Sequence, residues 1–361
     1  MDTPTITLTL LGASGSGKTL FLHGMYATLS AGVAGYFVYT RDPDDDVDLM
    51  DVWDRLNDKG TLPPPTDMDG QKSYEFVFTH GIDPLLHIDC VDFRGGATDG
   101  KSGDADDSQA IHDRLLVSDS IYLVLDGEHL ANWVLAIRDL DDVGASRPNR
   151  SRDPMKVAGL SRLIYTAVKA RQEQGKLPPS LVLLITKSDL IEPITGMSRG
   201  TALSIAARHM KALVPIAYSD GMTSLVCPVQ IGRLGTELHG TVDPDALDPV
   251  GLHRPFVFSL WYYLVEQIQN NRTALSYLRE QRSDARQTVD ELRSRLGGTL
   301  LHRGKIRAGE RTVGTRDQQI QEVERELAAL QSLADKLIAE LGRLPIVTDG
   351  RARLVLEEVQ R

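Results

Sequence analysis

The sequence predicts an α/β fold: a three-layer sandwich with a mostly parallel sheet and one antiparallel strand, followed by an α-helical hairpin. Segments of strand character alternate with segments of helical periodicity over residues 1–270, as in parallel sheets covered by helices. Two of the strand segments follow each other across a short turn, which favours an antiparallel pair. From residue 271 the apolar residues follow heptads. We therefore expect two domains, 1–270 and 271–361.

Length and composition are those of a globular protein. The chain has 361 residues, of which 41% are hydrophobic and 25% charged, close to average usage. Two cysteines are too few for a disulfide framework and favour a reducing compartment. The first residues lack a signal-peptide pattern, and no apolar stretch approaches the roughly 20 residues that span a bilayer. We expect a cytoplasmic protein without a transmembrane segment.

The charge is unevenly distributed. The whole chain has 40 basic and 50 acidic residues, a net charge of −10. Residues 271–361 hold 17 basic and 14 acidic residues, so the remainder holds 23 basic and 36 acidic residues. An acidic body disfavours broad contact with nucleic acid. We expect no nucleic-acid partner.

The first elements follow from local pattern. Thr5–Leu11 alternates threonine with apolar residues and predicts a strand. A glycine-rich turn separates it from an apolar-periodic helix over residues 20–30. In the aspartate-rich stretch 42–58 apolar residues recur at helical spacing, which predicts a helix with a solvated acidic face, ended by Gly60.

The middle of the chain continues the alternation. Strands are predicted at 74–78 and 85–91 as the antiparallel pair. Residues 94–107 are rich in Gly and Asp and predict a flexible stretch that leads into a short helix. A strand follows at Ile121–Asp126, and helical sequence lies on both sides of a break at 144–154.

The last alternating elements are short. Strands are predicted at Leu181–Ile185 and Ser224–Val229, and helices near 201–213 and from about 255 to 270. Together with the earlier segments they complete the α/β alternation.

Two heptad runs follow. The first is imperfect, at Leu275, Leu278, Ala285, Val289, Leu292 and Leu296. The second is regular, at Ile320, Val323, Leu327, Leu330, Ala334, Leu337 and Leu341. Between them, residues 297–314 contain glycines that break helices and four basic residues. Two heptad helices around a breaker predict an antiparallel hairpin, and such a hairpin can bind a partner helix.

The turn after the first strand carries a phosphate-binding motif. GASGSGKT fits GxxxxGK[ST] and lies between a predicted strand and a predicted helix, the context that gives this motif its meaning. The amides of its curled backbone and the helix N-terminus favour phosphate oxygens. Lys18 adds charge for the β- and γ-phosphates, and the Thr19 hydroxyl can bind Mg²⁺. The nucleotide-binding residues are expected to be Gly12, Ala13, Ser14, Gly15, Ser16, Gly17, Lys18 and Thr19.

A second motif ends the 85–91 strand. Asp92 and Gly95 form a DxxG arrangement. A carboxylate that leaves a buried strand beside the phosphate-binding turn can hold the water shell of Mg²⁺. The glycine three residues later offers a backbone N–H to the γ-phosphate.

A third motif follows the Leu181–Ile185 strand. Thr186, Lys187 and Asp189 fit [NT]KxD. An aspartate can accept hydrogen bonds from both N1–H and the exocyclic amine of guanine, a contact that adenine does not offer. The aliphatic part of the lysine can lie along the base.

In this order the three motifs resemble those of P-loop GTPases of the translation-factor and Ras-like (TRAFAC) class, across about residues 1–270. The loop before the 74–78 strand is similar to the first switch of bacterial double-GTPase and stress-associated GTPase domains. The resemblance implies GTP or GDP as ligand, Mg²⁺ as cofactor and GTP hydrolysis. It also implies a role for Thr66 at Mg²⁺ and the γ-phosphate, with Thr61 as the alternative.

The sequence also departs from that family. Gly96 stands where Ras-like members have a water-orienting glutamine, which predicts slow hydrolysis. Ser14 replaces the third glycine of the loop and crowds the route of an arginine supplied in trans. Arg94 could serve in cis, or it is an ordinary surface arginine. The segment CPVQIG after Ser224 lacks the family's Ser-Ala signature, so no base-binding residue is predicted there.

Three functions fit these motifs. The favoured one is a GTP-dependent switch whose state is transmitted through the hairpin to a protein partner. The second is a dynamin-like mechanochemical GTPase that self-assembles. The third is an ATP-using P-loop enzyme in which the TKSD segment is coincidental. Contact with a membrane surface through the basic hairpin tip stays open.

Overall fold

The computed structural model describes residues 3–63, 71–93, 105–138, 155–175, 177–235, 241–295, 303–342 and 344–353. The strands are β1 (Thr5–Gly12), β2 (Tyr36–Thr40), β3 (Gln71–His80), β4 (Asp83–Phe93), β5 (Ser120–Asp126), β6 (Ser180–Thr186), β7 (Thr223–Pro228), β8 (Gln230–Gly232), β9 (Leu247–Val250), β10 (Ile346–Thr348) and β11 (Arg351–Arg353). The helices are α1 (Lys18–Ser30), α2 (Pro43–Lys59), α3 (Ala105–Val117), α4 (Gly127–Ile137), α5 (Ala158–Glu173), α6 (Ile191–Thr195), α7 (Arg199–His209), α8 (Arg254–Arg295) and α9 (Arg303–Leu341). Short 3₁₀ turns are η3 (Ser188–Leu190), η4 (Met210–Ala212), η5 (Pro215–Tyr218) and η6 (Pro244–Ala246).

Within these residues nine strands form one mixed sheet, in the order β11-β10-β7-β6-β5-β1-β4-β3-β2. Its centre is parallel: β1 pairs with β4 and β5, and β6 pairs with β5 and β7. β3 is antiparallel to β4, as expected. The carboxyl ends of the parallel strands therefore meet at one edge, where α/β proteins place their ligand sites.

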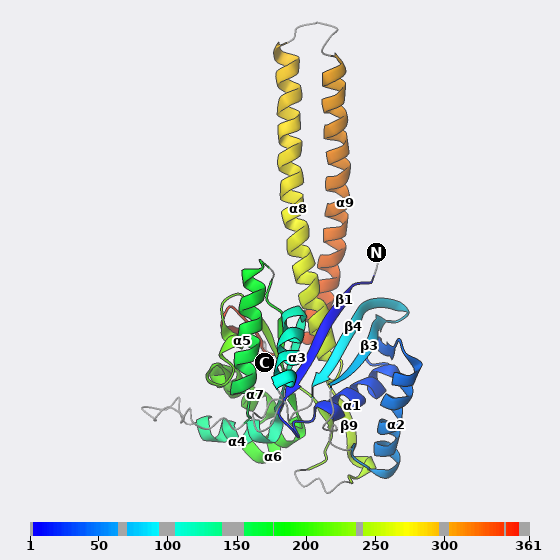
Figure 1. Ribbon diagram of the computed structural model, residues 1–361, viewed down its shortest axis with the longest axis vertical. Coiled ribbons are helices and arrows are strands. Elements are labelled where there is room, and N and C mark those ends of the chain that lie inside the picture. Colours follow the sequence, from blue (N-terminus) through cyan, green and yellow to red (C-terminus); the bar gives the residue numbers. More distant parts are fainter. Residues whose placement is uncertain are drawn as a thin grey trace, which may run out of the picture. The chain divides into compact units, whose positions relative to one another are not determined.

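Helices cover both faces of this sheet. Leu123 of β5 belongs to a buried cluster with Leu115 of α3 and Ile164 of α5. The preceding residue, Tyr122, faces the opposite way, and its hydroxyl lies 3.0 Å from Ser259 Oγ of α8. Figure 1 shows α3 and α5 on one side of the strands and α1 and α2 on the other. The predicted three-layer P-loop α/β fold is confirmed.

Helix α2 shows how the aspartate-rich stretch folds. Asp42 accepts a hydrogen bond from the N–H of Asp44 (3.0 Å), and Pro43 occupies the first helical position. Acidic residues fill the first turn, where the helix dipole favours them. Gly60 ends the helix with φ +64°, a left-handed conformation that glycine adopts without strain. The expected helix and its expected end are both present.

Several strands were not predicted. β2 extends the sheet beyond β3, with Tyr36 and Val38 buried. At the other end β10 pairs antiparallel with β7, so the sheet has a second strand of reversed direction. Its Ile346 and Val347 are buried. These strands have three to five residues, too few for a clear alternation of apolar and polar residues.

The chain divides into two compact units, residues 1–260 with 341–361 and residues 261–340. The first contains the sheet and the second the hairpin. These limits differ from the expected 1–270 and 271–361, because β10 and β11 return to the sheet after the hairpin. The hairpin is thus inserted in the chain between two parts of the first unit.

The helices of the hairpin are longer than expected. α8 runs without a break from Arg254 to Arg295, since no Gly or Pro follows Pro255 in this stretch. The expected breaker 297–314 is also shorter, because α9 begins at Arg303 and includes three of its glycines. A Cβ on Gly309 would lie 2.5 Å from Val289 Cγ2, so glycine there allows the two helices to approach closely.

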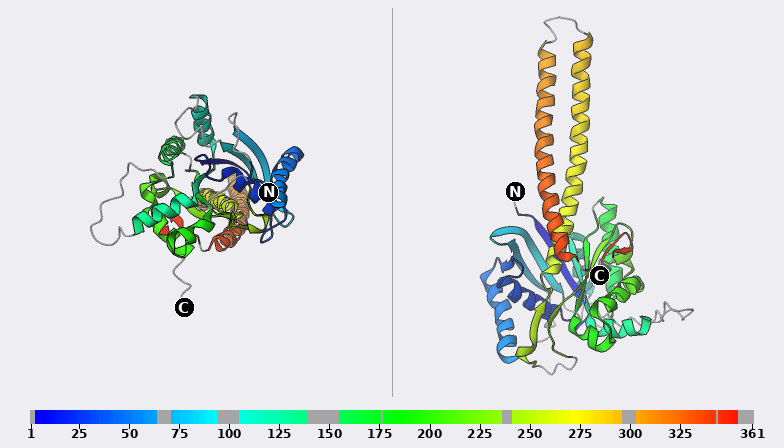
Figure 2. Two further views of the ribbon diagram at one scale, coloured as in Figure 1. Left: turned by 90° about the horizontal axis from the view of Figure 1, so that it is seen from below. Right: turned by 180° about the vertical axis from the view of Figure 1, so that it is seen from behind.

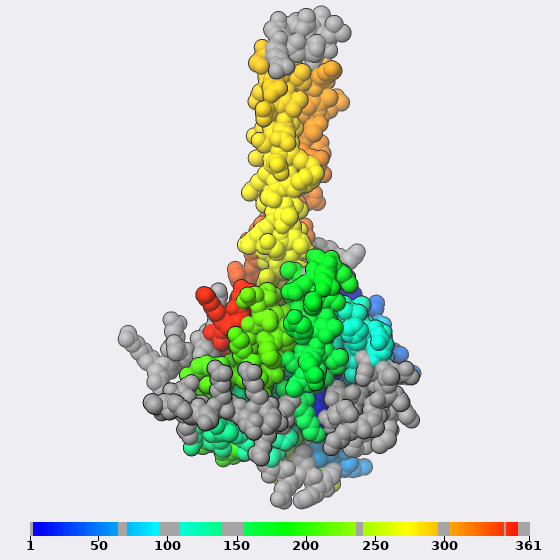
Figure 3. Space-filling view, turned by 60° about the vertical axis from the view of Figure 1, so that its left-hand side comes forward, coloured from blue at the N-terminus to red at the C-terminus, as the bar shows by residue number. Residues whose placement is uncertain are grey.

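The hairpin is held by apolar and ionic contacts. Buried heptad residues are Leu275, Val289, Ile320, Ala334 and Leu337. Ion pairs join the two helices at Arg279–Glu324 (2.8 Å), Arg282–Asp317 (3.1 Å) and Arg293–Glu310 (2.6 Å). Figures 2 and 3 show α8 and α9 side by side along their length. The predicted helical hairpin is confirmed.

Both cysteines lie inside the first unit. Cys90 of β4 and Cys227 of β7 are fully buried and form no disulfide. Burial raises the pKa of both thiols, to about 12 for Cys227. In the described part of the chain, no helix is both long and apolar enough to cross a bilayer.

Candidate nucleotide site

The GASGSGKT segment forms a tight loop between β1 and α1. Gly15 and Gly17 have φ of +76° and +84°, values that non-glycine residues rarely adopt. A Cβ on Gly12 would lie 2.8 Å from the carbonyl oxygen of Val124 on the neighbouring strand β5. Glycine is therefore required where the loop leaves the sheet and where it turns into the helix.

Lys18 occupies the inside of this loop. Its side chain is buried, and Nζ donates hydrogen bonds to the carbonyl oxygens of Gly12 (2.8 Å) and Ala13 (3.1 Å). Thr19 is half-buried in the first turn of α1. The Ser16 hydroxyl is buried without a hydrogen-bond partner among the described residues. A buried ammonium, orphan hydroxyl and helix N-terminus together form a cradle for anionic oxygen atoms.

Asp92 lies beside the loop at the end of β4, in register with Leu10 of β1. The carboxyl is buried, and its Oδ1 has no hydrogen-bond partner in the described structure. Burial raises the pKa of Asp92 to about 6, while the positive charges of Lys18 and Lys72 oppose this rise. A buried carboxylate oxygen without a donor is costly unless a cation neutralises it.

These residues fit a magnesium ion. Mg²⁺ prefers oxygen ligands and, in phosphate sites, takes only one or two from the protein. Asp92 and Thr19 offer a carboxylate and a hydroxyl on adjoining elements. Among the residues that the structure describes, no group of three or more His, Cys, Asp or Glu side chains gathers as a metal site.

Two predicted residues lie outside the described ranges. Thr66 and Gly95 fall in the segments 64–70 and 94–104, and so do Arg94 and Gly96. The alternative Thr61 is described: it is exposed and forms a β-bridge with Thr241.

The TKSD segment begins with the last residue of β6 and touches the phosphate-binding loop. The Thr186 hydroxyl is buried and donates to the carbonyl oxygen of Ser16 (2.6 Å). Lys187 has a left-handed φ of +48°, and its Nζ lies 2.5 Å from Asp126 Oδ2. The structure thus joins the first and third sequence motifs through a direct hydrogen bond.

Asp126 was not predicted as a site residue. It ends β5 and caps α4, with Oδ1 accepting from the N–H groups of Glu128 (2.9 Å) and His129 (3.3 Å). A Cβ on the next residue, Gly127, would lie 2.3 Å from the carbonyl oxygen of Thr186. The end of β5 therefore packs directly against the TKSD segment.

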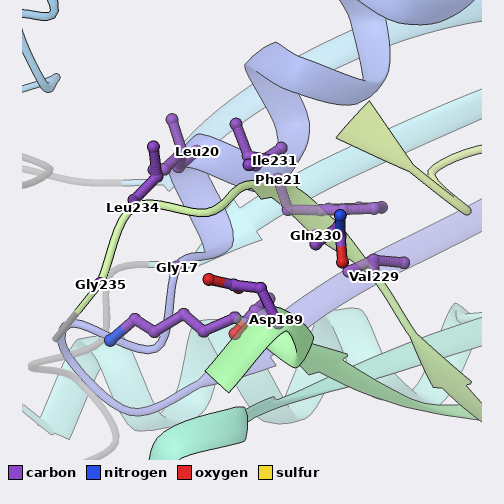
Figure 4. Close-up of a pocket in the computed structure, with 12 residues that line it drawn as sticks. Gly17, Leu20, Phe21, Asp189, Val229, Gln230, Ile231, Leu234 and Gly235 are labelled. Carbon is purple, nitrogen blue, oxygen red and sulfur yellow. The ribbon is translucent and has the colours of Figure 1, made fainter. Parts of the chain in front are cut away.

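Asp189 lies on a pocket beside this segment (Figure 4). Burial raises the pKa of its carboxyl, opposed by hydrogen bonds from the N–H groups of Asp189 and Leu234 and by the positive charge of Arg199. The backbone donors and Arg199 thus favour the charged form of a half-buried carboxylate.

The pocket and the solvent space at its mouth together take up about 490 Å³. One wall is apolar and a few polar groups converge on it, as is typical of sites for flat ligands. It is lined by Gly17, Leu20, Phe21, Thr186, Lys187, Asp189, Val229, Gln230, Ile231, Gly232, Leu234 and Gly235.

The sequence analysis missed one side of this pocket. Residues 229–235 follow β7 and lie beside the TKSD segment, where the N–H of Ser188 donates to the carbonyl oxygen of Val229 (3.2 Å). The resemblance to P-loop GTPases predicts a base-binding loop at this position, but no residue in it was predicted because the expected Ser-Ala signature is absent. Ile231 packs against α1: a Cβ on Gly24 would lie 2.4 Å from Ile231 Cδ1.

The segment continues toward α2. β8 pairs antiparallel with β9, and Val242, ahead of β9, lies at the end of α2. There the N–H of Val242 donates to the carbonyl oxygen of Gly60 (2.7 Å). A Cβ on Gly60 would lie 1.8 Å from the carbonyl oxygen of Val242. Residues 229–235 and 241–250, which we call the strap, are thus fixed to α1 and α2, respectively.

Comparisons with known proteins add little. No protein-family model matches the chain, and no curated protein matches it. Solved structures that match include the G domain of the T. maritima FeoB iron transporter, 14% identical with a TM-score of 0.25. The match covers 62% of this chain and 87% of that chain. A TM-score this low carries no argument, so the function is inferred from the residues described above.

Proposed function

We propose that this chain is a Mg²⁺-dependent GTP-binding protein that hydrolyses GTP slowly and acts as a molecular switch. One observation carries the proposal. Gly17 of the phosphate-binding loop and Asp189 of the TKSD segment line the same pocket. A phosphate cradle and a base-reading carboxylate at one pocket match the two ends of a nucleotide.

At the phosphate end, the loop amides of residues 12–19 bind the phosphate oxygens. Lys18 turns from its carbonyl partners toward the β- and γ-phosphates. Its hydrogen bonds to these charged oxygen atoms are stronger than those to neutral carbonyl groups. The Thr19 hydroxyl and the Asp92 carboxylate hold Mg²⁺. When bound, Mg²⁺ supplies positive charge that offsets the charge gathering on the transferred phosphoryl group.

At the base end, Asp189 accepts hydrogen bonds from N1–H and the exocyclic amine of guanine. Adenine offers neither donor in that geometry, so its complex leaves the half-buried carboxylate poorly paired. The stem of Lys187 lies along one face of the base, with its ammonium held by Asp126. The apolar side chains of the pocket cover the rest of the base.

Thr66 and Gly95 are proposed to contact Mg²⁺ and the γ-phosphate, respectively, in the GTP state. Loss of the γ-phosphate releases both segments, which is how a bound nucleotide switches a surface. Gly96 has no side chain to orient the attacking water, so hydrolysis is slow without a partner.

The hairpin is the proposed protein-binding element. Its two helices bury their heptad residues against each other and are joined by ion pairs. A partner therefore binds to their outer faces. The acidic balance of the remainder argues against nucleic acid as that partner.

Calorimetric titration of the purified chain with GDP and with ADP, each with and without Mg²⁺, tests the proposal. We expect GDP to bind at least about tenfold more tightly than ADP, with Mg²⁺ strengthening GDP binding. A preference for ADP would instead support an ATP-using P-loop enzyme and end the proposal.

The length of the hairpin favours one further candidate, a dynamin-like GTPase that self-assembles. α8 and α9 have 42 and 39 residues, or about 60 Å of helix each. Light scattering with GDP and with a non-hydrolysable GTP analogue separates the two. A constant mass in both states excludes nucleotide-driven assembly.

A further inference from the structure

Gln230 is a buried polar residue on the wall of the nucleotide pocket. It opens β8, directly after the strand next to the TKSD segment, and only 5% of its surface is exposed. Figure 4 shows its amide beside Val229 on the pocket wall. Burial of an amide is costly unless its donors and acceptor are paired.

The Gln230 amide joins two elements. Its Oε1 accepts a hydrogen bond from Arg199 Nη2 (2.9 Å), at the start of α7. Its Nε2 donates to the carbonyl oxygen of Asp248 on β9 (3.2 Å) and approaches Asp248 Oδ2 (3.4 Å). One side chain thus connects α7, the pocket wall and the second strand of the strap.

Gln230 shares the pocket wall with Asp189, and the charge of Arg199 links the two residues. This positive charge opposes the effect of burial on Asp189. The Arg199 backbone N–H donates to Glu192 Oε1 (2.8 Å), which fixes the start of α7. Its Nε is buried without a hydrogen-bond partner within the described residues. The guanidinium therefore depends on the bond from Nη2 to Gln230 for its position.

We propose that Gln230 is a positioning residue for base recognition: it holds the Arg199 guanidinium at the start of α7 and ties the wall of the pocket that Asp189 also lines to β9. This inference rests on the proposed function, because it assigns Asp189 to the base. In this chain the hydrogen bonds of Gln230 to Arg199 and Asp248 take the place of the missing Ser-Ala signature. The two parts of the network lie 31 residues apart in sequence.

The test compares binding of GDP, inosine diphosphate and ADP to the full chain with Mg²⁺. Inosine diphosphate lacks the exocyclic amine and reports the second hydrogen bond to Asp189. Gln230→Met keeps the length of the side chain and removes both hydrogen-bonding groups. We expect the GDP-to-ADP affinity ratio to fall about tenfold, mainly because GDP binds more weakly.

A conservative variant separates positioning from packing. Gln230→Glu combined with Asp248→Asn keeps an acceptor for Arg199 without placing two carboxylates side by side, so we expect most of the selectivity to remain. The matched control is Gln287→Met on the exposed surface of α8, which should change no affinity. Should Gln230→Met fail to fold, Arg199→Gln tests the same contact and should give the same loss of selectivity.

Two results would overturn the inference: a folded Gln230→Met or Arg199→Gln variant with wild-type selectivity, or a Gln230→Glu/Asp248→Asn double variant as impaired as Gln230→Met. A failure of the proposed function looks different. In that case the wild-type chain itself shows no preference for GDP over ADP.

Discussion

The two ends of the pocket are built in different ways. The phosphate end comes from one continuous stretch, residues 12–19, and its main contacts are local: Lys18 bonds to carbonyl groups five and six residues earlier. The base end is assembled from the ends of β5 and β6 and from the strap, which are spread over more than 100 residues of the sequence. A contiguous motif can therefore form a phosphate cradle, whereas selectivity for a base depends on tertiary contacts.

The largest effect is expected at the phosphate end. Lys18→Ala removes the buried ammonium and should weaken both GDP and ADP binding about 100-fold or more, because charge-assisted bonds to phosphate are lost whatever the base. Calorimetry measures both affinities. Lys211→Ala, at an exposed lysine on η4, is the control. A loss confined to GDP would contradict the division into two ends.

Next in size is a change at the anchor of the strap. Gly60→Ala should destabilise the fold by about 3 kcal/mol, because the new Cβ meets the carbonyl oxygen of Val242 and strains a left-handed residue. Denaturant unfolding measures the change in free energy. Gly159→Ala is the control: a Cβ there meets nothing within 4 Å, and alanine in helix α5 should be neutral or stabilising. Equal stability of the two variants would refute this role of Gly60.

Next, the variant Asp189→Asn tests the base end alone. The amide cannot accept two donors as the carboxylate does, so GDP affinity should fall about 30-fold and ADP affinity should stay the same. Parallel titrations with both nucleotides measure the ratio. Asp220→Asn, an exposed aspartate, should alter neither value. Unchanged selectivity would show that Asp189 does not read the base.

The smallest effect concerns Asp92 and pH. Its folded pKa, about 6, lies above the unfolded value near 4, so the folded state binds the proton more tightly. The favourable contribution is present below about pH 4 and is lost as pH rises through 6. Asp92→Asn should therefore stabilise the Mg²⁺-free, nucleotide-free protein at pH 7.5 by about 2 kcal/mol, and by less at pH 4.5.

Thermal unfolding at the two pH values measures this difference. Asp54→Asn on the exposed side of α2 serves as the control. With Mg²⁺ and GDP the order should reverse, because the wild-type carboxylate then has its cation. A variant that is less stable than the wild type in the Mg²⁺-free protein would refute this account of Asp92.

The sequence predicted the contiguous parts of the molecule. β1, the phosphate-binding loop and the TKSD segment are read from neighbouring residues, and so is α2 with its Asp42 and Gly60 ends. Asp126 and Gln230 were not predicted, because their roles depend on partners 61 and 31 residues away. The unbroken α8 was missed because the change from core helix to heptad pattern at Asn271 resembled a boundary.

The buried cysteines have a practical consequence. A thiol attacks alkylating reagents only as the thiolate, and burial keeps Cys90 and Cys227 protonated and out of reach. The folded chain should therefore not react with thiol-directed reagents, and neither native cysteine has to be replaced before labelling. A pair of cysteines introduced at exposed positions, one on α5 and one on α9, would carry spin labels or fluorophores with little background. Distances between such labels, recorded with GDP and with a GTP analogue, would report directly on the hairpin's response to nucleotide.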